Sequence, residues 1–77
     1  MNQIIKDELY NLTLDDLKQI KNNIESIEDI IRENNQGVIT DKEAFIELPL
    51  FSRLLVKSSD RVKQCVDVIN QLSKKEN

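Results

Sequence analysis

The sequence predicts an all-α fold: an antiparallel hairpin of two long helices that forms one domain over residues 1–77 and is completed into a bundle by dimerisation. Two stretches support this prediction. In each, a set of residues recurs at alternating steps of three and four, which places the set along one side of a helix. The first stretch is Leu17, Ile20, Ile24, Ile27 and Ile31, and the second is Leu48, Phe51, Leu55, Ser58, Val62, Cys65, Ile69 and Leu72. Only one Gly and one Pro are present, so the chain has few positions for sharp turns.

The first long helix is expected over about residues 13–36. Thr13 is a favourable N-cap residue, and Asp16 places negative charge in the first helical turn. Gly37 can adopt the left-handed conformation of a helix cap without steric penalty, which predicts where this helix ends. Before it, Ile5 and Leu9 stand four residues apart and predict a short helix near 2–10.

The second half of the chain begins with another helix start. Thr40 and Glu43 have the spacing of a capping box. Pro49 disfavours helical geometry in the residue before it, so we expect a short helix over 41–47 and a second long helix over 49–73. In the antiparallel pair, this layout places Lys74 near Asp16.

The segment 44–56 contains more apolar residues than one side of a helix can bury against a single partner. They are Ala44, Phe45, Ile46, Leu48, Leu50, Phe51, Leu54, Leu55 and Val56. Leaving several of these side chains in water forgoes several kcal/mol of burial free energy, at about 25 cal/mol per Å². We therefore expect self-association as a homodimer; the alternatives are coverage by residues 2–12 or a surface reserved for another protein.

Composition narrows the class of protein. The formal net charge of −3 argues against nucleic acid as a partner, because non-specific binding needs clustered positive charge. The absence of His and the single Cys65 exclude a structural zinc site and an intramolecular disulfide, which fits a reducing compartment. No apolar run approaches the roughly 20 residues of a membrane span. We expect a soluble cytoplasmic protein, and its ten Ile, eight Lys, eight Asn and fourteen acids suggest an AT-rich coding sequence, as in many phages and low-GC bacteria.

No residue set predicts catalysis, a cofactor or a metal. The acids lie on the polar side of the first long helix, where nothing desolvates a carboxylate pair for acid–base chemistry. Cys65 sits in the apolar repeat and lacks a His to activate its thiol. The sequence therefore predicts a protein that is not an enzyme.

The function favoured by these patterns is a protein–protein interaction module that self-associates and binds or inhibits a partner, such as a host protein acted on by a phage-like regulator. The candidate partner-binding residues are Phe45, Leu48, Leu50, Phe51, Arg53, Leu54, Lys57 and Arg61. The alternative is a nucleic-acid-binding regulator that uses Arg53, Lys57 and Arg61, which recur at steps of four.

Overall fold

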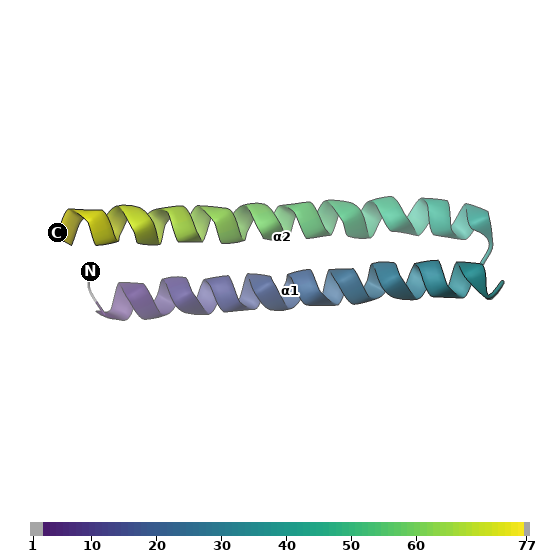
Figure 1. Cartoon of the computed structure of the whole chain (residues 1–77), viewed down its shortest axis with the longest axis horizontal. Helices are drawn as coiled ribbons and strands as arrows, with labels where there is room; N and C mark the ends of the chain where they lie inside the picture. The colour runs from purple at the N-terminus through teal and green to yellow at the C-terminus, as the bar shows by residue number, and fades with distance from the viewer. Residues whose placement is uncertain (1–2, 77) are drawn as a thin grey trace.

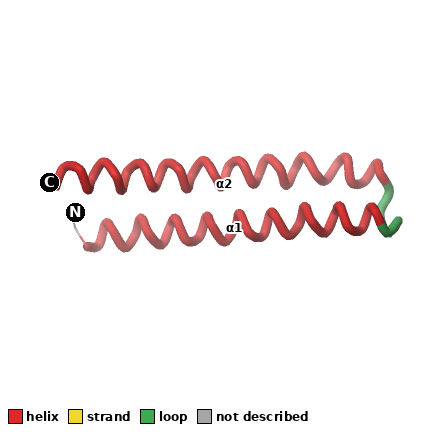
Figure 2. Tube along the Cα trace, viewed as in Figure 1, coloured by secondary structure: helices red, strands yellow, loops and turns green. Residues whose placement is uncertain are grey.

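A computed structural model describes residues 3–76 and consists of two long helices lying side by side. Helix α1 runs over Gln3–Asn35 and helix α2 over Asp41–Glu76. The helices are antiparallel, so that the two ends of the chain lie at one end of the molecule (Figure 1). The short connection lies at the other end (Figure 2). The predicted all-α antiparallel hairpin is therefore confirmed.

The hairpin is a rod two helices thick. It measures 57 × 15 × 13 Å, with a radius of gyration of 17.3 Å. A compact domain of this length would have a radius of gyration of about 11.5 Å. The two helices therefore leave most of their surface in contact with solvent.

The end of α1 is fixed by Gly37, as the sequence predicts. Gly37 has a φ of 75° and donates a hydrogen bond from its N–H to the carbonyl of Asn34 at 3.1 Å. Val38 donates to the carbonyl of Glu33 at 2.8 Å. These two bonds form a Schellman motif, which satisfies carbonyls that the helix itself leaves open.

The start of α2 is the predicted capping box. The N–H of Glu43 donates to Thr40 Oγ1 at 3.2 Å, and the N–H of Thr40 donates to Glu43 Oε1 at 3.4 Å. Asn34 Nδ2 also donates to Asp41 Oδ1 at 2.8 Å, which joins the end of α1 to the start of α2. The turn is thus held from both sides.

The predicted start of the first long helix at Thr13 is wrong. Thr13 lies inside α1, and its Oγ1 donates to the carbonyl of Leu9 at 2.7 Å instead of capping a helix. The described part of the predicted 2–10 helix and the 13–36 helix are one element; residue 2 lies outside the described residues. The propensity cost of Asn11 and Thr13 is a few tenths of a kcal/mol each, which packing against α2 outweighs.

The predicted division of the second half at Pro49 is also wrong. Pro49 lies inside the continuous helix α2, and the helix runs on through residues 58–60 without a break. Pro49 is exposed, so it withdraws one N–H from the ladder on the side away from α1. On either side of it, Leu48 and Phe51 are half-buried against α1 and hold the chain in line.

The face of α2 that packs on α1 follows the predicted repeat. Every predicted member is buried or half-buried, from Leu48 to Leu72, and Ala44 extends the row by one step. On α1 the inward row is Lys6, Leu9, Thr13, Asp16, Ile20, Asn23, Ile27, Ile30 and Asn34. This row shares only Ile20 and Ile27 with the predicted stripe.

The other three members of the predicted α1 stripe face away from α2. Leu17, Ile24 and Ile31 are 38%, 40% and 48% exposed. Helix α1 thus carries an apolar row beside its inward row of mixed polar and apolar residues, and α2 covers only the inward row. Among the described residues, the buried apolar side chains are Ile30 and Ala44, so the core within one chain is small.

Candidate protein-interaction surface

The residues of the two inward rows define the heptad position of each remaining residue in both helices. Inward residues occupy positions a and d, and positions e and g flank them on the two broad faces of the hairpin. The e positions of the two helices lie on the same face because the helices are antiparallel. We call this the uncharged face; its residues are Gln3, Tyr10, Leu17, Ile24 and Ile31 of α1 and Phe45, Ser52, Ser59, Val66 and Ser73 of α2.

The opposite face, formed by the g positions, differs in charge. Its residues are Ile5, Leu12, Gln19, Ser26 and Glu33 of α1 and Glu47, Leu54, Arg61, Val68 and Lys75 of α2. Four of these ten residues are Glu, Arg or Lys, whereas the uncharged face contains no Asp, Glu, Lys or Arg. Two-stranded coiled coils usually carry charges at both e and g. The asymmetry therefore marks the uncharged face as a surface suited to further packing.

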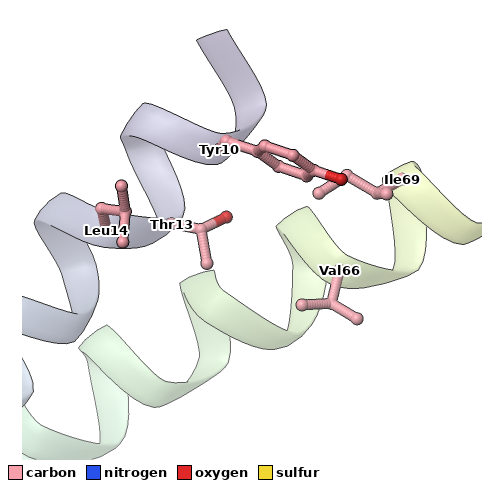
Figure 3. A pocket seen from close by; sticks show the side chains of 5 residues that line it. All are labelled: Tyr10, Thr13, Leu14, Val66 and Ile69. Carbon is pink, nitrogen blue, oxygen red and sulfur yellow. The ribbon is translucent and has the colours of Figure 1, made fainter. Parts of the chain in front are cut away.

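The uncharged face contains an open apolar hollow of about 340 Å³ near the chain ends. Tyr10, Thr13 and Leu14 line it from α1, and Val66 and Ile69 line it from α2. Figure 3 shows the Tyr10 ring extending from α1 toward Ile69. The lining offers no convergent set of polar groups, so the hollow suits an apolar side chain better than a polar metabolite.

The structure separates the predicted apolar partner-binding residues. Leu48 and Phe51 are half-buried in the contact with α1. Phe45 is 72% exposed and belongs to the uncharged face. Leu50 and Leu54 are exposed on the other side of α2, Leu54 at a g position. These residues do not form one continuous patch.

The predicted basic residues follow a spiral around α2. All three are exposed, but steps of four carry them from the outer side at Arg53, through Lys57, to the g position at Arg61. Arg61 contacts α1, because its Nε donates to Asp16 Oδ1 at 2.9 Å. The predicted pairing of Asp16 with Lys74 is not the one found, because α2 begins at Asp41 instead of residue 49, which shifts its residues along α1.

Chemistry-bearing residues are scattered over the hairpin. Cys65 is half-buried in the contact between the helices. Within residues 3–76, no three His, Cys, Asp or Glu side chains are grouped in a way that suits a metal ion. Over the same residues, neither helix is apolar enough along its length to cross a membrane.

Sequence reasoning missed the uncharged face, although its signal is present in the chain. Tyr10, Leu17, Ile24 and Ile31 recur at intervals of seven, and such a row keeps one position on a heptad. The predicted stripe combined three of these four residues, Leu17, Ile24 and Ile31, with two residues of the inward row. Placing it correctly required the register of the two helices.

The class of molecule that this geometry defines is an antiparallel α-helical hairpin with one uncharged, largely apolar face. Comparison of the chain with protein-family models, with curated proteins and with solved structures gives no match. Any functional assignment therefore rests on the chain's own residues.

Proposed function

We propose that this chain is a non-enzymatic protein–protein interaction module, which self-associates and binds or inhibits another protein. The observation that carries the proposal is the exposure of sixteen large apolar side chains among the described residues. Full burial of one such side chain contributes about 1.5–3 kcal/mol. Three or four of them therefore match the net stability of a small domain, which is about 5 kcal/mol.

The surface proposed for a different protein lies on α2 around Leu50 and Leu54. Both side chains are exposed, and Lys57 and Arg53 lie within one turn of them. Apolar residues beside cations suit an amphipathic helix whose apolar stripe is flanked by Asp or Glu. The proposed setting is the cytoplasm, and the AT-rich coding sequence suggested by the high Ile, Lys and Asn content supports a phage or mobile-element regulator that acts on a host protein.

Self-association is tested by light scattering on the full chain over a wide range of concentrations. The proposal expects a molar mass at least twice 9.0 kDa as the concentration rises. A mass of 9.0 kDa throughout would contradict it.

Partner binding is tested by affinity capture with Leu54→Asp and Val68→Asp. Both residues are exposed g-position side chains of α2, at 48% and 42%, and they lie two heptads apart. The proposal expects Leu54→Asp to lose captured protein that the wild type and Val68→Asp retain. Equal capture by all three chains would exclude this surface.

A further inference from the structure

We infer that the uncharged face binds a second copy of this chain, face to face and antiparallel, with Phe45 of each copy covering the hollow of the other. This inference rests on the proposed self-association and adds the face, the direction and the residues that meet. Three observations identify a second copy as the partner that covers this face: the distribution of charge, the positions of the residues along the face, and the accessible surface area of the chain.

Charge selects the uncharged face over the opposite one. Stacking two copies through the g positions would desolvate Glu33, Glu47 and Lys75 and disturb the bond between Arg61 and Asp16. Removing such charges from water costs several kcal/mol each unless they find good partners. None of the ten residues of the uncharged face is charged, and the one cation recorded beside them is Lys6, whose Nζ lies 5.5 Å from the centroid of the Tyr10 ring. The serine hydroxyls of this face can donate to carbonyls of their own helix.

The positions along the uncharged face are complementary to themselves. The two-fold axis of such a dimer is perpendicular to the helices and passes midway between Phe45 and Val66. It places the e-position row of each helix against the same row of the second copy, running in the opposite direction. Helix α1 then places Tyr10 over Ile31 of the second copy and Leu17 over Ile24. Helix α2 places Ser52 over Ser59, so that small side chains meet at the centre of the α2 row, whereas Leu17 and Ile24 make apolar contacts at the centre of the α1 row.

The hollow and its proposed occupant lie at opposite ends of this face. Phe45 is 72% exposed near the turn, while Val66, 21 residues further along α2, lines the hollow. At 1.5 Å per residue they are about 31 Å apart. Figure 3 shows that the hollow is bounded by side chains of both helices. An antiparallel second copy therefore brings its Phe45 over Val66 while the two 57 Å rods overlap for most of their length.

The accessible surface of the chain matches the requirement of a dimer. The hairpin exposes 5950 Å², whereas a compact monomer of 9.0 kDa would expose about 4,900 Å². The surplus is about 1,000 Å², and a stable interface covers about 800 Å² on each partner. One second copy on one face is enough to remove it.

Disulfide cross-linking tests the arrangement. In a Cys65→Ala background, which removes the native thiol, we introduce Phe45→Cys together with Val66→Cys. The two thiols of one chain are too far apart to join, because a disulfide needs Cα atoms within about 7 Å. Oxidation is expected to give a covalent dimer from the double variant and not from either single variant.

The matched control uses Glu47→Cys with Val68→Cys in the same background. These residues have the same spacing of 21 but lie on the opposite face. Cross-linking of this pair, or of Phe45→Cys alone, would overturn the inference. A dimer by light scattering that fails to cross-link through positions 45 and 66 would also overturn it and leave the proposed function standing, whereas a monomer at every concentration would overturn both.

A second measurement does not depend on disulfide geometry. Phe45→Ala is expected to weaken dimerisation at least 100-fold, because each dimer loses two buried rings. Ile46→Ala is the control, since Ile46 is exposed on the outer side of α2. Equal dissociation constants for the two variants, with helicity retained, would contradict the role of Phe45.

Discussion

Arg61 of α2 donates a hydrogen bond from Nε to Oδ1 of Asp16 on α1, at 2.9 Å, and so joins two residues 45 positions apart. The Asp16 side chain is only 13% exposed at an inward position, whereas that of Arg61 is 44% exposed. The bond therefore joins a carboxylate covered in the contact between the helices to a guanidinium that lies at the solvent-exposed edge of that contact. It also fixes their register at one level of the rod.

Loss of this bond is expected to destabilise the hairpin. Arg61→Ala leaves a largely covered carboxylate without its cation, and we expect a loss of about 1–2 kcal/mol in the free energy of unfolding. Urea denaturation of Asp16→Ala, Arg61→Ala and the double variant measures the coupling between the two side chains. Because Arg61 is partly solvated, the coupling should be about 0.5–1 kcal/mol. Strictly additive effects would show that the pair contributes nothing.

Replacement of Pro49 is expected to stabilise the protein. Pro49→Ala restores an N–H that can donate to the carbonyl of Phe45 and relieves the ring clash, which is worth up to about 3 kcal/mol in a helix interior. Lys63→Ala is the control, because Lys63 is exposed two heptads further along the same side of α2. That change should stay within about 0.5 kcal/mol. An unfolding midpoint for Pro49→Ala no higher than that of the wild type would contradict the prediction.

The sequence predicted the hairpin correctly and its interruptions wrongly, for one physical reason. Local chemistry determines the turn: Gly37 and the Thr40–Glu43 box satisfy open backbone groups whatever lies beyond them. Local chemistry at Thr13 and Pro49 was outweighed by packing along the rod. The uncharged face needed the register of α1 on α2, which a pattern in one helix does not contain.

Gly37 is expected to act through its backbone alone. Its φ is 75°, and a Cβ built there meets no atom within 4 Å. Gly37→Ala should therefore cost only the left-handed strain, about 1–2 kcal/mol. Gly37→Asn should cost less, because Asn tolerates this conformation better. Thermal unfolding of both variants checks the order, and an equal or larger loss for Asn would contradict it.

Binding to nucleic acid is expected to be absent. Arg61 is engaged with Asp16, and the spiral of Arg53, Lys57 and Arg61 lies on a chain with a net charge of −3. Fluorescence anisotropy with short DNA and RNA at low salt should show no binding. Binding that weakens steeply between about 50 and 200 mM salt would reveal phosphate contacts and support the alternative function.

The two adjacent residues Asn22 and Asn23 provide the sharpest test of the register. Asn23 is buried at an inward position of α1, whereas Asn22 is exposed on the outer side. A polar residue at such an inward position lowers stability while restricting the arrangements that the helices can adopt. We expect Asn23→Leu to raise the free energy of unfolding by about 1–2 kcal/mol, since the new side chain is buried against α2.

Asn22→Leu makes the same chemical change one residue earlier and should alter stability by about 0.5 kcal/mol or less. Urea denaturation at one fixed protein concentration compares the two variants without a contribution from mass action. If Asn22→Leu were the stabilising change, the inward row would have to be rotated by one residue. The uncharged face would then no longer consist of the residues assigned to it.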